Sequence, residues 1–205
     1  MSDPRRNVTA MNLPKRHSGR TARHDPGCPG CAKEAAGAEP DQLAYMNWIT
    51  GTIGEHGWAV PGVEGDGAVP PWAYSVGMWL TCQTPELVVC GAPVRNAAGI
   101  VNAIGARIAD GAEFGPDDVL DDICPARLIL RPVDLSWRTT GMFMISDQFY
   151  GFVRPPYLQV VWADRNNRFP WEPGFQARFD GLQPLLWLPR DDNPPTSWTR
   201  LDQPR

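Results

Sequence analysis

The chain has 205 residues, of which 42% are hydrophobic and 20% are charged, a balance typical of a globular protein and not of a disordered or coiled-coil one. Residues 1–40 carry seven basic and four acidic residues, whereas residues 41–205 carry twelve basic and nineteen acidic ones. The acidic body argues against a nucleic-acid binder, because attraction to phosphates requires a basic face. No stretch approaches the ~20 apolar residues of a membrane span, and the basic N-terminus lacks the apolar core of a secretion signal. We therefore expect a cytoplasmic protein without a membrane partner.

The sequence predicts one folded domain between two flexible tails. Residues 1–40 are rich in Arg, Pro and Gly and have little apolar periodicity, which is typical of a tail. Residues 41–188 are predicted to form a single domain, and residues 189–205 a polar tail. Pro and Gly number 22 and 20, so the elements should be short and the loops numerous.

In chain order, apolar residues first recur at helical spacing over residues 41–56, where Gly57 follows as at a helix end. The same pattern predicts a helix over residues 94–109, ended by Gly111, and a short helix is predicted over residues 139–149. Residues 114–122 are expected to be an acidic loop. Strands are predicted at residues 58–64, 72–78, 86–90, 127–133, 158–162 and 185–188.

The order of these elements predicts an α+β fold. Several successive strands are joined by short turns, which favours a mainly antiparallel sheet over a parallel doubly wound one. Two or three helices are expected to pack against one face of this sheet. We expect Trp72 and Tyr74 to share a face, because they are two residues apart on a strand.

Two discontinuous runs of sequence indicate a family. The first comprises His56 to Glu64, Pro70 to Gly77 and Pro85 to Val89, and the second comprises Leu158 to Arg165, Arg168 to Phe175 and Gln183 to Leu186. Over about residues 41–188 the chain resembles the bacterial domain-of-unknown-function family DUF4262. The resemblance implies no particular activity. Family members commonly have His before the Pro-Glu pair, where this chain has Thr84, so no role for that histidine transfers.

A metal site is one interpretation of the N-terminal cysteines. Cys28-Pro29-Gly30-Cys31 presents two thiols to one ion, with His24 as a third ligand, and zinc is the metal that such a motif favours. The missing ligand would come from His17, Cys82, Cys90 or Cys124. A redox dithiol and ordinary tail cysteines are the alternatives. Some members of the resembling family carry a similar motif near their start.

Six polar residues in the family-like runs are candidates for catalysis: His56, Glu64, Tyr74, Asp164, Arg168 and Glu172. Each has a structural alternative. His56 would interact with a helix dipole, Glu64 would lie in a solvated turn, and Tyr74 would pack in the core. Asp164 and Arg168 would hold a hairpin turn. Glu172 would either have a raised pKa beside Trp171 or accept backbone hydrogen bonds.

Five further residues are candidates for ligand contacts: Trp72, Arg138, Gln159, Trp162 and Trp171. Arg138 would bind an anion or pair with an acid. Together these residues favour a small-molecule-binding or enzyme-like domain with an aromatic and carboxylate-lined pocket. The alternative is a protein-interaction module, such as an accessory or immunity-type subunit, and zinc would stabilise either one. The sequence leaves open whether the chain forms a homo-oligomer, and it contains none of the established catalytic or nucleotide-binding motifs.

Overall fold

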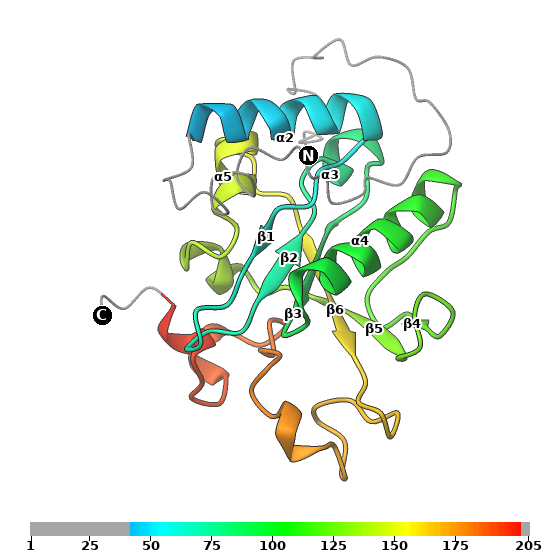
Figure 1. The fold of residues 1–205 in the computed structure, drawn as a ribbon, viewed down its shortest axis with the longest axis vertical. Coiled ribbons are helices and arrows are strands. Elements are labelled where there is room, and N and C mark those ends of the chain that lie inside the picture. The colour runs from blue at the N-terminus through cyan, green and yellow to red at the C-terminus, as the bar shows by residue number, and fades with distance from the viewer. Residues whose placement is uncertain (1–41, 202–205) are drawn as a thin grey trace, which may run out of the picture.

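The computed structural model describes residues 42–201, which form a six-stranded sheet with four α-helices (Figure 1). The helices are α2 (Gln42–His56), α3 (Met78–Thr81), α4 (Val94–Ala109) and α5 (Met144–Tyr150). The strands are β1 (Gly62–Val63), β2 (Trp72–Tyr74), β3 (Glu86–Cys90), β4 (Val119–Leu120), β5 (Leu128–Pro132) and β6 (Tyr157–Trp162). Short 3₁₀-helices are η2 (Leu135–Thr139), η3 (Ala177–Phe179), η4 (Arg190–Asp192) and η5 (Trp198–Arg200).

The sheet is mixed, so the expectation of a mainly antiparallel sheet is wrong. Its strand order is β1-β2-β3-β6-β5-β4, and the central strands β3 and β6 are parallel, with Glu86 opposite Tyr157. A parallel pair requires a long crossover connection. Here the chain leaves β3, crosses as α4, adds β4 and β5 at the far edge, and returns through η2 and α5. The sequence predicted the short turns between successive strands, but it did not show that β3 and β6 are paired across this long connection.

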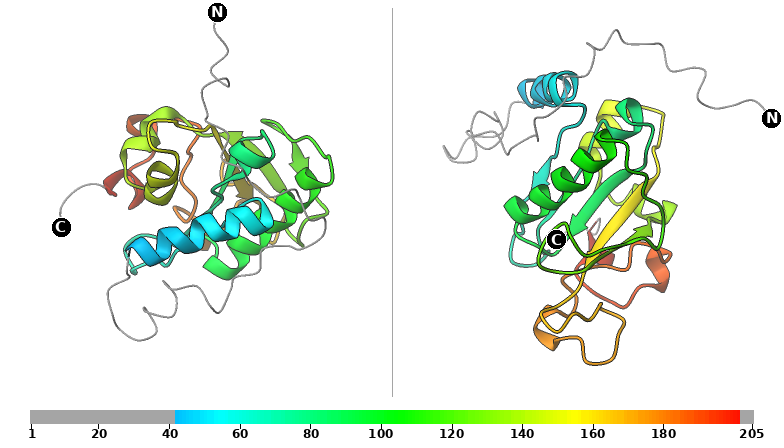
Figure 2. Two further views of the ribbon diagram at one scale, coloured as in Figure 1. Left: turned by 90° about the horizontal axis from the view of Figure 1, so that it is seen from above. Right: turned by 90° about the vertical axis from the view of Figure 1, so that its right-hand side faces the viewer.

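Both faces of the sheet are covered, which also corrects the expectation that helices pack on one face only. Successive strand residues point to opposite faces. Leu87 and Val89 therefore pack in a core with α4, while Val88 and Cys90 pack in a second core with Phe143 of the η2–α5 segment. Figures 1 and 2 show α4 running along one side of the sheet and α2 lying across one end. None of the helices among the described residues is long and apolar enough to cross a membrane.

Most of the predicted elements are confirmed within a few residues. Helices form over Gln42–His56 and Val94–Ala109, and strands over Glu86–Cys90, Leu128–Pro132 and Tyr157–Trp162. The predicted strand 58–64 is reduced to β1 and one isolated bridge, between Ala59 and Val76. The predicted helix 139–149 forms only as α5 (Met144–Tyr150), since η2 ends at Thr139. The sequence did not reveal α3 or β4.

Two expectations for the C-terminal part of the chain are wrong. No strand forms at residues 185–188, because the Gln159 side chain pairs with this backbone, donating to the Pro184 carbonyl and accepting from the Leu186 N–H. Residues 189–201 are not a flexible tail. Trp198 is fully buried and packs edge-on against Trp72 at 5.7 Å, since a tryptophan has a large apolar area to bury. The predicted N-terminal tail lies outside the described residues.

Substitutions at two glycines of α4, Gly99 and Gly105, test how this helix packs on the sheet. A Cβ atom added at Gly105 would lie 2.6 Å from Met78 Cε and 2.8 Å from Trp58 Cζ2, while one at Gly99 would meet nothing within 4 Å. We expect Gly105→Ala to lower the free energy of unfolding by about 1–3 kcal/mol through overpacking. Gly99→Ala should raise it by about 0.5–1 kcal/mol, because alanine favours the helix. Urea denaturation measures both, and equal effects would contradict the packing described.

Candidate functional site

A group of buried polar side chains surrounds Glu86, the first residue of β3. Its Oε1 accepts the backbone N–H groups of Gly77 at 2.9 Å and Trp79 at 3.1 Å, and the Tyr150 hydroxyl donates to the same oxygen at 2.5 Å. Its Oε2 forms a short hydrogen bond with the Ser75 hydroxyl. Glu86 and Ser75 are both fully buried. One carboxyl group thereby joins the chain just after β2, the start of α3 and the end of α5.

The protonation of this group follows from its burial. Desolvation raises the pKa of Glu86, and the hydrogen bonds from Ser75, Tyr150, Trp79 and Gly77 only partly oppose that rise. Burial and the adjacent Glu86 carboxylate also raise the pKa of the Tyr150 phenol. Glu86 therefore holds its proton to a higher pH than an exposed glutamate does.

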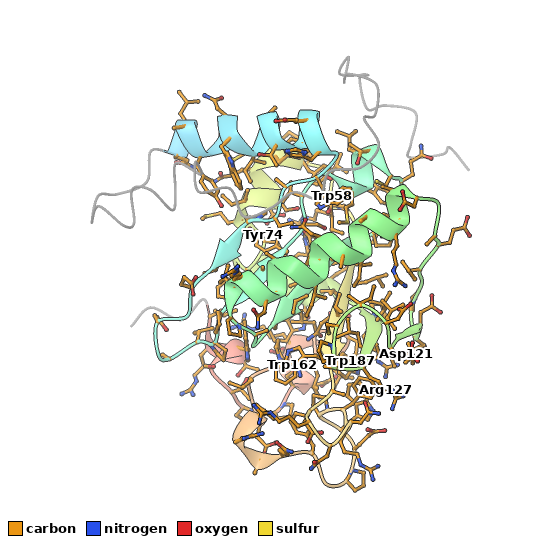
Figure 3. All side chains as sticks on the ribbon, turned by 45° about the vertical axis from the view of Figure 1, so that its right-hand side comes forward. Trp58, Tyr74, Asp121, Arg127, Trp162 and Trp187 are labelled. Atoms are coloured by element: carbon orange, nitrogen blue, oxygen red, sulfur yellow. The ribbon has the colours of Figure 1, made fainter. Side chains whose placement is uncertain are left out.

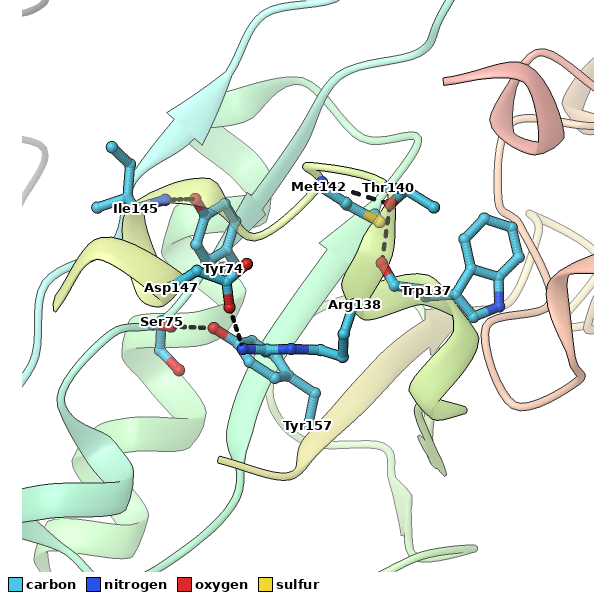
Figure 4. Close-up of polar contacts among 9 residues, drawn as sticks. All are labelled: Tyr74, Ser75, Trp137, Arg138, Thr140, Met142, Ile145, Asp147 and Tyr157. Atoms are coloured by element: carbon cyan, nitrogen blue, oxygen red, sulfur yellow. Dashed lines mark hydrogen bonds and ion pairs between the residues drawn. The ribbon is translucent and has the colours of Figure 1, made fainter. Parts of the chain in front are cut away.

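A second polar group adjoins the first, and we call it the Arg138 cluster: Arg138, Phe143, Ser146, Asp147 and Tyr157. The Arg138 guanidinium lies against the Phe143 and Tyr157 rings, 5.1 and 5.0 Å from their centroids. Its Nη2 donates to Asp147 Oδ1 at 2.5 Å (Figure 4). The Arg138 side chain is 3% exposed and that of Asp147 37%. A buried positive charge thus has one carboxylate partner, which reaches the surface.

Local structure holds these side chains in place. Asp134 caps η2 by accepting the Ser136 backbone N–H at 2.9 Å, which fixes the turn that carries Arg138. Gly141, at φ 72°, reverses the chain between η2 and α5, a conformation that favours glycine. Tyr157, at the start of β6, donates to the Ser75 carbonyl at 3.1 Å and so links the Arg138 cluster to the Glu86 group.

The Arg138 cluster contains buried donors without acceptors. Four buried side-chain polar atoms have no hydrogen-bond partner within residues 42–201, and three of them are Arg138 Nε, Arg138 Nη1 and Ser146 Oγ. Burial raises the pKa of the Tyr157 phenol, and an interaction with the nearby Ser146 hydroxyl, which does not reach the geometry of a hydrogen bond, opposes the rise. A buried donor without an acceptor costs about 1–3 kcal/mol. An acceptor that reached these atoms would therefore stabilise the protein.

The predicted site residues on β2 lie beside this cluster or in the core. Tyr74 and Trp72 share a face, as expected. The Tyr74 hydroxyl accepts the Ile145 backbone N–H at 3.2 Å, and burial raises its pKa, so it remains a protonated phenol (Figure 4). The Trp72 indole donates to the Met142 carbonyl at 3.1 Å and is buried against Trp198. Tyr74 therefore adjoins the Arg138 cluster, and Trp72 is a core residue.

The candidates in the loop after β6 hold the shape of that loop. Asp164 accepts the backbone N–H groups of Asn166 at 2.8 Å, Arg168 at 3.0 Å and Gln176 at 2.8 Å. Desolvation opposes the ionisation of Asp164, but these hydrogen bonds outweigh it and lower its pKa. Glu172 accepts the Phe169 N–H at 2.8 Å, as the structural alternative predicted, and the Arg168 side chain is exposed.

Trp162 and Trp171 lie away from the Arg138 cluster, and Figure 3 shows Trp162 and Trp187 at a distance from Tyr74. Trp162 lines an apolar groove of about 430 Å³ between α4 and residues 123–126, on the α4 side of the sheet. Trp171 stacks on Phe169 at 5.2 Å, and Arg131 lies over its ring. The expected single pocket that would combine Trp72, Tyr74, Trp162 and Trp171 does not form.

The remaining candidates are separate from both polar groups. His56 ends α2, where its ring lies 3.7 Å from the Glu55 carboxylate, and Glu64 is exposed after β1. Gln159 is buried, and its side chain forms hydrogen bonds with the backbone of residues 184 and 186, so its role is structural. The predicted zinc ligands His24, Cys28 and Cys31 lie outside the described residues. Within residues 42–201 no three His, Cys, Asp or Glu side chains are grouped to hold a metal.

Sequence reasoning missed most of the polar residues that the fold brings together: Ser75, Glu86, Ser146, Asp147, Tyr150 and Tyr157. One signal was available. Glu86 opens the apolar strand Leu87 to Cys90, and an acid at the head of a fully buried strand needs partners. Nothing local to Ser146 or Asp147 distinguishes them from surface residues of a short helix.

Replacing the buried carboxyl tests its protonation. Because the folded-state pKa of Glu86 is raised, its contribution to stability is full below its unfolded-state pKa and is lost as pH rises through the folded-state pKa. We expect the free energy of unfolding of the wild type to fall relative to that of Glu86→Gln as pH rises above the ordinary glutamate value of 4.5. Urea denaturation from pH 5 to pH 8 measures the difference. Glu113→Gln, at an exposed position, should show no such trend.

Comparisons with known proteins agree with the resemblance seen in the sequence. No curated protein and no solved structure matches the chain. A family described as Domain of unknown function (DUF4262) matches residues 52–176, which is more than half of the chain and spans both polar groups. The chain therefore belongs to the DUF4262 family.

Proposed function

We propose that this chain is a small-molecule-binding domain whose ligand is held at the Arg138 cluster. The observation that carries the proposal is the set of buried donors on Arg138 and Ser146 that have no acceptor among the described residues. Buried polar groups in folded proteins are almost always hydrogen-bonded. Three unmatched atoms in one cluster therefore favour an acceptor outside residues 42–201, which we take to be a bound ligand.

The helix α5 covers this cluster and gives it a route of access. Ser146 is the one residue of α5 that is buried, so most of this two-turn helix faces solvent or lies at its border. Gly141 and Gly151 flank the helix at φ 72° and 62°, and an added Cβ at either would meet nothing within 4 Å. The apolar residues Ile145, Phe149 and Tyr150 of α5 are only partly buried. A small displacement of α5 would uncover Arg138 and Ser146.

A second candidate function is binding to another protein at the same segment. Large apolar side chains are exposed here, with Leu135 at 72%, Met144 at 56% and Phe152 at 108% exposure. Exposed apolar residues that gather in one segment favour a contact surface. A partner bound there would cover α5 and control access to the Arg138 cluster.

We also infer that the chain works in the cytoplasm. Its five cysteines are an odd number, and the three within the described residues, Cys82, Cys90 and Cys124, are free thiols. Free thiols suit a reducing compartment. Zinc binding by His24, Cys28 and Cys31 is proposed only as an addition to this function, since those residues lie outside residues 42–201.

Native mass spectrometry of gently purified protein tests the proposed function. We expect one small molecule bound per chain, or, where the molecule is lost in purification, stabilisation by members of a chemically diverse panel in a thermal-shift screen. A protein that carries nothing and responds to no compound would contradict ligand binding. A stable complex with another protein in that case would favour the second candidate.

Two serine substitutions separate a ligand contact from a structural one. The Ser146 hydroxyl makes no hydrogen bond of good geometry within residues 42–201, whereas the Ser136 hydroxyl accepts the Arg190 N–H at 2.9 Å. We expect Ser146→Ala to leave the free energy of unfolding of the ligand-free protein unchanged or to raise it, and to weaken ligand binding about tenfold. Ser136→Ala should lower the free energy of unfolding by about 1 kcal/mol and leave affinity unchanged. Urea denaturation and calorimetric titration measure the two quantities. If Ser136→Ala weakened ligand binding and Ser146→Ala did not, the ligand would lie outside the Arg138 cluster.

A further inference from the structure

We infer that the group recognised at the Arg138 cluster is an oxyanion, a carboxylate or a phosphate, and that the Asp147 carboxylate competes with it for Arg138. This inference rests on the proposed function and adds the chemical class of the ligand. It follows from the balance of donors and acceptors, from the burial of the guanidinium and from the exposure of its partner.

The unmatched atoms of the cluster are all donors. Arginine has N–H groups on three nitrogens and no acceptor, and in Arg138 only Nη2 has an acceptor within residues 42–201. The Ser146 hydroxyl can donate to the same ligand. The Nε–H and Nη1–H bonds point apart, but each lies beside an N–H of Nη2. An oxyanion that replaces Asp147 at Nη2 therefore pairs its oxygens with Nη2 and one of the two unmatched nitrogens, and it can also accept from the Ser146 hydroxyl.

The surroundings of Arg138 favour an anion over a neutral acceptor. The Arg138 side chain is only 3% exposed. The rings of Phe143 and Tyr157 cover its guanidinium, with their centroids 5.1 and 5.0 Å away. Little water screens its charge, so a full negative charge gains more there than it would at the surface. The rings also hold the guanidinium in one orientation, so its donors are fixed before a ligand arrives.

Asp147 is the residue of the Arg138 cluster that can move into solvent when a ligand binds. Its side chain is 37% exposed and stands on α5, between Gly141 and Gly151, whereas Arg138 is buried on η2. When α5 moves, the Asp147 carboxylate can pass into water at low cost, while Arg138 stays within reach of the ligand. The ion pair between Arg138 and Asp147 therefore shows how a ligand carboxylate would bind Arg138 once Asp147 has moved away. The negative charge of Asp147 limits the affinity for that ligand.

The experiment measures thermal shift and calorimetric affinity for sodium acetate and sodium phosphate at pH 7, with sodium chloride holding the ionic strength constant. Acetamide serves as the neutral analogue of acetate. We expect acetate or phosphate to stabilise the wild type and acetamide to have no effect. The arm that responds distinguishes a carboxylate ligand from a phosphate ligand.

Substitutions assign the effect to the cluster. Asp147→Asn keeps an acceptor for Nη2 and removes the competing charge, so it should tighten oxyanion binding about tenfold. Arg138→Gln should abolish binding in a protein whose circular dichroism shows it folded, and if that variant does not fold, Asp147→Asn and Ser146→Ala carry the test. Asp122→Asn is the matched control, because it neutralises an exposed aspartate that pairs with Arg107 at 2.8 Å. It should leave binding unchanged.

The two proposals fail in different ways. If acetamide binds as well as acetate, or if Asp147→Asn leaves or weakens oxyanion binding, the oxyanion inference is overturned. A compound from the diverse panel that still binds at Arg138 would then keep the proposed function. If no compound of any class binds, both proposals are overturned.

Discussion

The buried carboxyl group of Glu86 connects three separate segments of this protein to the central sheet. It forms hydrogen bonds with the backbone N–H groups of Gly77 and Trp79 and with the hydroxyls of Ser75 and Tyr150. These bonds join the chain after β2, the start of α3 and the end of α5 to the head of β3. A carboxyl buried this completely is tolerated only when its oxygens are satisfied. Tyr150 thereby ties the end of α5, which covers the Arg138 cluster, to the head of β3.

The central parallel pair explains why two polar groups meet at this place. Parallel pairing puts the start of β3 beside the start of β6, with Glu86 opposite Tyr157. The hydroxyl of Tyr157 then reaches the Ser75 carbonyl, and its ring supports Arg138. Residues far apart in the sequence thus form one polar region under α5, at the end of the sheet where β3 and β6 begin.

The runs of sequence that identify the family divide into two roles in the structure. The first run supplies Ser75, Gly77 and Glu86, which build the buried carboxyl group. The polar residues of the second run, Asp164 and Glu172, hold a loop by accepting backbone N–H groups. The Arg138 cluster draws Arg138, Ser146 and Asp147 from between these runs. Family resemblance therefore led to the residues that support the Arg138 cluster and not to Arg138, Ser146 and Asp147 themselves.

The sequence by itself determined the local elements, because the spacing of apolar residues and the placing of glycines act within one helix or strand. It correctly predicted α2, α4 and the strands β3, β5 and β6, and two of its candidate residues, Tyr74 and Arg138, lie at the Arg138 cluster. Only the tertiary structure decided the parallel pairing of β3 with β6, the burial of Trp198 and the partners of Glu86. Those features depend on contacts between distant segments, and a side chain such as Ser146 acquires its role only when the packing around it removes water.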